Sequence, residues 1–131
     1  MEHGDFTSLA KNYIHRPGYD HLLLNSIAKV IGISDYSTSK IVDVGAGTGK
    51  LTEELSKIGF ENITSVEPND SMREEGIIYT KDRNIKWISG SGESTNVESN
   101  FADWVLMGSS FHWTNTNKSL PEFSRILKEK G

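Results

Sequence analysis

The fold is decided by the stretch Lys40-Ile41-Val42-Asp43-Val44-Gly45-Ala46-Gly47-Thr48-Gly49. Its first half is a short run rich in β-branched residues, which predicts a buried strand at residues 40–44. After the glycines, Leu51, Leu55 and Ile58 recur at helical spacing, and Gly59 is placed to end that helix. A buried strand that turns through glycines into an amphipathic helix is typical of an α/β protein.

The same alternation continues towards the carboxyl end. Strands are predicted at residues 63–67, 85–88 and 102–107, and the last is almost entirely apolar, as expected where both faces of a strand are covered. Strands that alternate with helices are joined by right-handed crossovers, which give a parallel sheet. The predicted fold class is therefore α/β, with a Rossmann-like, doubly wound parallel sheet.

Three other helices are expected from capping residues and periodicity. The first covers residues 20–31 between Asp20 and Gly32, and its apolar face carries Leu23, Ile27 and Ile31. The starts of the other two are predicted from capping boxes, in which a glutamate follows a serine by three positions. These pairs are Ser71 with Glu74, before the helix-weakening Gly76, and Ser119 with Glu122, where Pro121 falls in the first turn.

Length and composition narrow the class of protein. The chain has 131 residues, enough for a single domain, with a helical segment expected at residues 1–34 and an α/β core at residues 35–131. The net charge of −4 gives no support for a nucleic-acid partner. There is no cysteine, and the histidines lack ligand spacing, so no metal site is expected. No apolar run reaches the ~20 residues that span a bilayer, and the start lacks a secretory signal, so a cytoplasmic location without a membrane partner is expected.

The glycine-rich turn is the clearest sign of a ligand. Glycine permits positive φ and lets a ligand approach the backbone, although a turn without a ligand can use the same residues. A dinucleotide fingerprint would have a third glycine where Lys50 stands, and a phosphate loop would have serine or threonine where Leu51 stands. Asp43 is the second-last residue of the strand before the turn, where a carboxylate repels a diphosphate and attracts a cation. The turn therefore favours a positively charged adenosyl ligand.

A second acid supports the same type of ligand. Glu67 ends the second predicted strand, where a carboxylate can accept hydrogen bonds from both hydroxyls of a ribose. Taken alone, it is equally compatible with a charge at the start of the next helix. Together with the glycines, it indicates a ribose-containing ligand.

In combination, these segments resemble class I S-adenosylmethionine-dependent methyltransferases, and most of all their small-molecule, trans-aconitate-methyltransferase-like (methyltransferase type 11) group. Residues 42–49 resemble the first motif of the family, and Val66-Glu67-Pro68 with Met72 resembles the second. Residues 90–95 stand where the family has a turn after its third strand. Ser110-Phe111-His112-Trp113 resembles the signature that follows the fourth strand.

The resemblance implies an enzyme that transfers a methyl group from S-adenosyl-L-methionine to a small molecule and leaves S-adenosyl-L-homocysteine. It assigns to the cofactor the residues Asp43, Gly45, Ala46 and Gly47 (methionine portion and loop), Glu67 (ribose), Pro68, Met72, Gly92 and Glu93 (adenine side), and Arg16 (a carboxylate). It assigns to the substrate the residues Tyr19, Ser110, Phe111 and Trp113. His112 is the candidate catalytic residue, as a base or as a group that orients the substrate, while a purely structural role is an equal alternative.

The chain departs from the family after the fourth strand. Relatives continue into further strands, whereas this sequence ends at Gly131, so the domain is expected to be truncated and residues 102–107 to form a sheet edge. An apolar edge strand favours association, and a homodimer that covers this edge is expected.

Two alternatives to an active methyltransferase stay open. Much of the substrate wall follows the fourth strand in relatives, so the chain can also be interpreted as a cofactor-binding module without catalysis. A nicotinamide-dependent oxidoreductase is disfavoured by Asp43 and by the spacing of the glycines. The Asp/Asn-Pro-Pro-aromatic sequence of nucleic-acid amino-methylating members is absent after the fourth strand, which points away from DNA or RNA as the acceptor.

Overall fold

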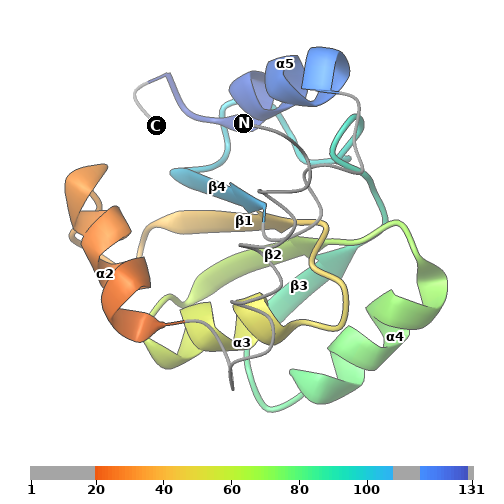
Figure 1. Ribbon diagram of the computed structural model, residues 1–131, viewed down its shortest axis with the longest axis horizontal. Coiled ribbons are helices and arrows are strands. Elements are labelled where there is room, and N and C mark those ends of the chain that lie inside the picture. The colour runs from red at the N-terminus through yellow and green to blue at the C-terminus, as the bar shows by residue number, and fades with distance from the viewer. Residues whose placement is uncertain (1–19, 108–115, 130–131) are drawn as a thin grey trace, which may run out of the picture.

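The computed structural model describes residues 20–107 and 116–129 (Figure 1). In chain order their elements are α2 (His21–Val30), β1 (Lys40–Val44), α3 (Lys50–Lys57), β2 (Asn62–Val66), α4 (Asp70–Tyr79), β3 (Ile85–Ile88), β4 (Trp104–Met107) and α5 (Thr116–Ile126). The predicted alternation of strands and helices is confirmed, and β1 and β3 have the bounds expected from the sequence. Among the described helices, none is both long and apolar enough to cross a membrane.

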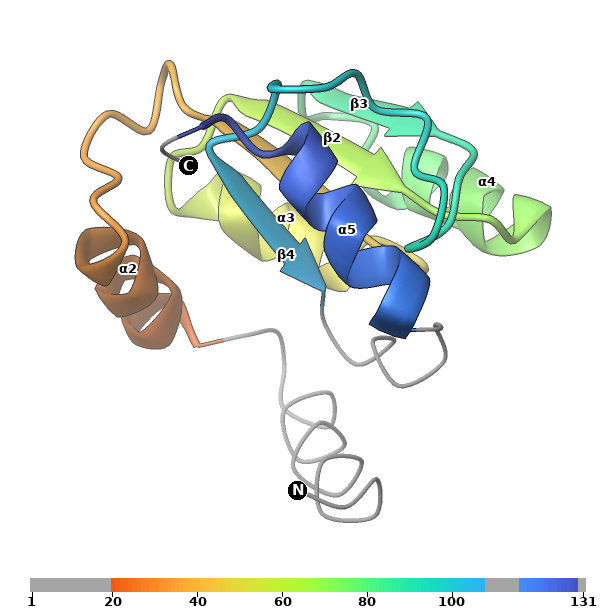
Figure 2. The same ribbon diagram turned by 90° about the horizontal axis from the view of Figure 1, so that it is seen from above.

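The strands form one parallel sheet in the order β3-β2-β1-β4. Helices α3 and α4 lie on one face of the sheet and α5 lies on the other, so the sheet is the middle of three layers (Figures 1 and 2). The chain places β2 and β3 on one side of β1 and β4 on the other. Open α/β sheets bind ligands at such a switch point, beyond the carboxyl ends of the strands.

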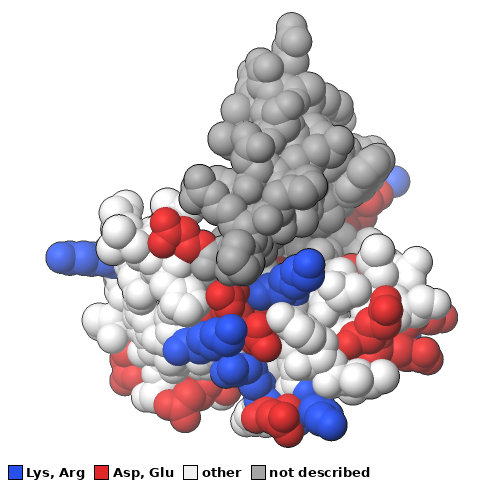
Figure 3. Space-filling model, turned by 60° about the horizontal axis from the view of Figure 1, so that its bottom comes forward, with Lys and Arg blue, Asp and Glu red and all other residues white. Residues whose placement is uncertain are grey.

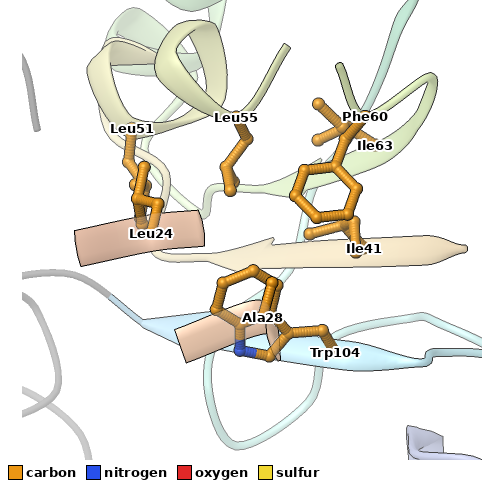
Figure 4. Packing of buried hydrophobic residues seen from close by; sticks show 8 residues of the cluster. All are labelled: Leu24, Ala28, Ile41, Leu51, Leu55, Phe60, Ile63 and Trp104. Carbon is orange, nitrogen blue, oxygen red and sulfur yellow. The ribbon is translucent and has the colours of Figure 1, made fainter. Parts of the chain in front are cut away.

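Two apolar clusters hold the layers together. The first, between the sheet and helices α2 and α3, consists of Leu24, Ala28, Ile41, Leu51, Leu55, Phe60, Ile63 and Trp104 (Figure 4). The second, on the face covered by α5, consists of Val42, Val44, Val66, Val97, Ala102 and Ile126. Because side chains alternate along a strand, Ile41 and Asp43 face α3, whereas Val42 and Val44 face α5.

Helix α2 is confirmed, but the prediction of its buried face is wrong. Asp20 caps its start by accepting a hydrogen bond from the N–H of Leu22 at 2.9 Å. The buried residues are Leu24 and Ala28, while the predicted residues Leu23, Ile27 and Ile31 are 37%, 38% and 48% exposed. The sequence carries two adjacent apolar stripes, and the one that meets Trp104 of β4 is the one that becomes buried.

Both predicted capping boxes are wrong. Asn69, not Ser71, caps α4: its side chain accepts a hydrogen bond from the N–H of Met72 at 2.9 Å. Helix α5 begins three residues before Ser119, so Ser119 and Glu122 lie inside it. Glu122 bonds to a distant segment of the chain, and this long-range contact replaces the expected local one.

Gly76 is used for packing within α4. A Cβ at this position would lie 2.2 Å from Cη2 of Trp87 on β3. The indole N–H of Trp87 donates to the hydroxyl of Thr80 at 3.0 Å, which holds the ring between α4 and the sheet. The residue that lowers the helix propensity of α4 therefore allows this helix to approach β3.

Strand β4 lies at one edge of the sheet and starts two residues later than predicted. The N–H of Asp103 donates to Lys40 of β1, whereas Ala102 forms a bridge with Leu127 on its opposite side. The chain after α5 therefore begins to run beside β4, away from β1. The backbone N–H and C=O groups of successive residues point to opposite sides of a strand. Those of Trp104 and Leu106 therefore point away from β1, to the side on which Leu127 lies.

Candidate functional site

The glycine loop joins β1 to α3 and bends over the end of β2. Gly45, Gly47 and Gly49 have φ values of +68°, +59° and +91°, which favour glycine. The N–H groups of Gly45 and Ala46 donate to the carbonyl of Val66 at 2.8 and 3.0 Å. A Cβ on Gly47 would have no heavy atom within 4 Å, so the loop is open at this point.

Glu67 connects this loop to helix α4. It follows β2 directly and is buried, with 6% of its surface exposed. Its Oε1 accepts a hydrogen bond from the N–H of Gly47 at 2.7 Å, and its Oε2 accepts one from the N–H of Asn69 at 2.9 Å. Each carboxylate oxygen keeps a second lone pair for a ligand. The predicted ribose contact stays a prediction.

Asp43 lies beneath the loop in the buried layer. It is 1% exposed, and its Oδ2 accepts a hydrogen bond from the hydroxyl of Thr52 on α3 at 2.7 Å. The same hydroxyl is 2.7 Å from that of Ser65, the register partner of Asp43 on β2. These three side chains connect β1, β2 and α3. The predicted contact of Asp43 with the methionine portion of a cofactor stays a prediction.

The protonation of Asp43 depends on this environment. Burial raises the pKa of Asp43 to about 7, the hydrogen bond from Thr52 opposes this effect, and the negative charge of Glu67 adds to it. A cation over the loop would stabilise both carboxylates and lower the pKa of Asp43. The electrostatics of the site therefore favour a positively charged ligand.

The predicted adenine side lies around the start of α4. Pro68 is exposed directly after Glu67, and Met72, in the first turn of the helix, is 45% exposed. Their predicted contacts with adenine are untested. A groove of about 520 Å³ borders the glycine loop at Thr48 and runs between α3 and α4, but none of the predicted site residues lines it; its other lining residues are Lys50, Glu75, Ile78 and Tyr79.

The turn after β3 carries two other predicted adenine contacts. Gly92 is buried and Glu93 is exposed. The N–H of Ser91 donates to the carbonyl of Ser94 at 3.0 Å, and the N–H of Ser94 donates back at 3.3 Å. The turn is therefore closed by its own backbone, and the roles of Gly92 and Glu93 stay predictions.

Six predicted site residues lie outside the described residues. They are Arg16 for the cofactor, Tyr19, Ser110, Phe111 and Trp113 for the substrate, and His112 for catalysis. Among residues 20–107 and 116–129, no three His, Cys, Asp or Glu side chains gather as a metal site would require.

Several residues that shape the site were not predicted from the sequence. Thr52 could have been found, because a threonine on the buried face of a predicted helix needs a polar partner. Thr95 and Glu122 gave no such signal, since they are 27 positions apart and their contact joins the turn after β3 to α5.

The residues around the loop fit a cationic adenosyl cofactor. A loop that binds phosphate presents its backbone N–H groups to the ligand. Here the N–H groups of Gly45, Ala46 and Gly47 donate to Val66 and Glu67 instead. At Gly47 the loop therefore has open space for a ligand, next to the buried carboxylate of Glu67.

Comparisons with known proteins agree with this geometry. A family model described as "Methyltransferase domain" matches residues 42–131. An uncharacterized methyltransferase of Mycobacterium tuberculosis is 29% identical over 92 residues, which are 70% of this chain and 37% of that protein. A probable S-adenosylmethionine-dependent methyltransferase of Saccharomyces cerevisiae is 27% identical over 121 residues, which are 88% of this chain and 40% of that protein.

The fold is similar to that of solved structures. A SAM-dependent methyltransferase of Aquifex aeolicus superposes with a TM-score of 0.69 at 18% identity, over 98% of this chain and 68% of that one. The chain thus spans 37% and 40% of the length of the two curated relatives named above.

Proposed function

Because the chain belongs to the methyltransferase domain family, we propose that it binds S-adenosyl-L-methionine at the glycine loop and that the protein transfers the methyl group to a small-molecule acceptor. When bound, this cofactor supplies an electrophilic methyl group on a positively charged sulfur. The loop at Gly47 would lie against the methionine portion, Glu67 would accept the ribose hydroxyls, and Met72 would pack on the adenine. The product that remains is S-adenosyl-L-homocysteine.

The observation that carries the proposal is the hydrogen bond from Gly47 N–H to Glu67 Oε1, at 2.7 Å. Because the N–H of Gly47 already donates to Glu67, it is not available to a phosphate. The same bond places the carboxylate of Glu67 next to the open side of the loop. A diphosphate would meet the carboxylate of Glu67 here, and that of the buried Asp43 when it is ionised, whereas a cation would be attracted by both and would favour the ionised form of Asp43. This favours a sulfonium cofactor over a nicotinamide dinucleotide.

Two observations support a small-molecule acceptor. On the face shown in Figure 3, Lys and Arg side chains are interspersed with Asp and Glu rather than gathered, and the net charge is −4. A polyanion such as nucleic acid is bound by clustered positive charge.

Methyl transfer needs alignment of the acceptor with the methyl group and exclusion of water, for which we propose the aromatic segment of residues 110–113. His112 is our candidate for the base or the orienting group.

The binding step is tested with a matched pair of glycine variants. Gly47 and Gly32 both have positive φ, +59° and +89°, and a Cβ on either would meet no heavy atom within 4 Å. Gly47→Ala and Gly32→Ala therefore bring similar backbone strain, but only the first places a methyl group over the loop. In calorimetric titrations with S-adenosyl-L-homocysteine, we expect Gly47→Ala to bind about tenfold more weakly or worse, which corresponds to a loss of at least 1.4 kcal/mol.

Gly32→Ala is the control and should bind like the wild type. The proposal is refuted if the wild type does not bind the ligand, or if both variants retain its affinity. A second assay with labelled S-adenosyl-L-methionine and a panel of acids, alcohols and amines then tests transfer. Binding without transfer to any acceptor would favour the alternative of a cofactor-binding module.

A further inference from the structure

We propose that Glu122 of α5 is a positioning residue for the cofactor site, because through Thr95 it fixes the turn at residues 90–95 beside Glu67. This inference rests on the proposed function for its ligand. Its structural basis is a set of hydrogen bonds that link α5, on one face of the sheet, to the turn that leaves β3 at the carboxyl edge.

The turn starts next to the acid at the centre of the site. The N–H of Glu67 donates to the carbonyl of Ile88, the last residue of β3, at 3.1 Å. The chain then enters the turn through Gly90, where a Cβ would lie 2.4 Å from the carbonyl oxygen of Thr95. The two ends of the turn are therefore in contact, so a displacement of Thr95 would be passed to Gly90.

Glu122 holds Thr95 by two hydrogen bonds. Its Oε2 accepts one from the N–H of Thr95 at 2.9 Å and one from the hydroxyl of Thr95 at 2.7 Å. Thr95 is fully buried, and the side chain of Glu122 is 11% exposed. Hydrogen bonds to a charged acceptor are the stronger kind, so this contact fixes the end of the turn firmly.

Arg125 completes the arrangement one helical turn later. Its Nε and Nη2 donate to the two carboxylate oxygens of Glu122, each at 2.8 Å, and its Nη2 also donates to the carbonyl of Val97 at 2.6 Å. Arg125, with the hydrogen bonds from Thr95, lowers the pKa of Glu122 to about 2, so the carboxylate stays charged in all ordinary buffers. The pair thus anchors the segment that follows the turn as well as the turn itself.

Glu122 and Arg125 form an ion pair three positions apart on α5, and Ser124 between them is exposed. What Glu122 and Arg125 share is their contact with residues 95–99, which connect the turn to β4. The position of Gly92 and Glu93 relative to Glu67 therefore depends on α5.

The test measures the affinity for S-adenosyl-L-homocysteine in four variants. Thr95→Val removes the hydroxyl but keeps the shape and the N–H, and Thr95→Ser keeps the hydroxyl. Glu122→Gln removes the charge, and Ser124→Ala is the control on the same helix. We expect about tenfold weaker binding for Thr95→Val and Glu122→Gln, and wild-type affinity for Thr95→Ser and Ser124→Ala.

A second readout separates positioning from a loss of stability. Hydrogen exchange of the backbone N–H groups at residues 91–94, which bond neither to Thr95 nor to Glu122 directly, should become faster in Thr95→Val and Glu122→Gln, while exchange in β1 and β2 stays slow. Wild-type affinity in both variants, or weaker binding in Thr95→Ser equal to that in Thr95→Val, would overturn the inference. If the wild type itself does not bind the ligand, it is the proposed function that fails, and faster exchange in the turn still tests the contact with α5.

Discussion

Replacing Gly76 with alanine should destabilise the protein, although the same change stabilises most helices. In an exposed helix interior, alanine is favoured over glycine by about 1 kcal/mol. At position 76 the added Cβ would lie 2.2, 2.6 and 2.9 Å from three ring carbons of Trp87. Either the indole or helix α4 must move by more than an ångström to reach ordinary contact distance.

The sizes of the opposing effects decide the sign. Overpacking of this kind costs about 1–3 kcal/mol. Moving the indole also breaks the hydrogen bond from Trp87 to Thr80, whose net contribution is about 1 kcal/mol. After the gain in helix propensity is taken into account, Gly76→Ala should lower the free energy of unfolding by about 1–3 kcal/mol.

The assay is equilibrium unfolding in urea, followed by far-ultraviolet circular dichroism. The control is the double variant Gly76→Ala with Trp87→Leu, because the smaller leucine side chain leaves room for the Cβ of alanine. In the Trp87→Leu background, Gly76→Ala should therefore cost much less free energy of unfolding than it costs in the wild type. The coupling between the two positions should exceed about 1 kcal/mol. If Gly76→Ala is more stable than the wild type, or if the two changes are additive, the account of the contact between α4 and β3 is incorrect.

Three other predictions follow from the described structure. Since the pKa of Asp43 is about 7 in the folded protein, against about 3.9 in an unfolded chain, folding favours the protonated carboxyl, and its stabilising effect is lost as the pH rises from about 4 to about 7. Asp43→Asn should remove this part of the pH dependence, and urea midpoints that vary with pH in parallel for both proteins would disprove it. Asn69→Ala should lower the free energy of unfolding by about 1 kcal/mol through loss of the α4 cap, whereas Asn69→Asp should stay near the wild type in thermal melts. The edge strand Trp104–Met107 should promote a homodimer, seen as a mass that rises with concentration in light scattering, and a stable monomer at high concentration would count against it.

The part of the fold that could be predicted is the part coded by local pattern. The β-branched run of β1 and the run containing Trp87 predicted strands with the observed bounds. The change of period after Gly49 predicted α3, with Leu51 and Leu55 on its buried face. These segments are short and have one apolar pattern each, so nothing distant needs to be known to assign them.

Two of the errors occurred where a contact outside the predicted pattern decided between local options, whereas at α4 the nearby Asn69 took the cap expected of Ser71. Helix α2 has two possible apolar stripes, and Trp104 determines which of them is buried. Glu122 has a serine at the spacing of a capping box, but Thr95 and Arg125 supply stronger partners. Within the site, the glycines and Glu67 were found because their residue types are constrained, while the hydroxyl groups around Asp43 depend on how two strands and a helix meet.

Beneath the glycine loop, the hydroxyls of Thr52 and Ser65 form a chain of hydrogen bonds whose donor direction depends on the protonation of Asp43. A threonine hydroxyl has a single hydrogen. If Thr52 gives it to Asp43, Ser65 must give its own to Thr52, so an ionised Asp43 orders both groups towards itself. When Asp43 is protonated, the direction can reverse. Asp43 on β1 can then donate to Thr52 on α3, and Thr52 can donate to Ser65 on β2. One proton can thus reverse the dipoles of two side chains in the layer that supports the loop, without moving any heavy atom.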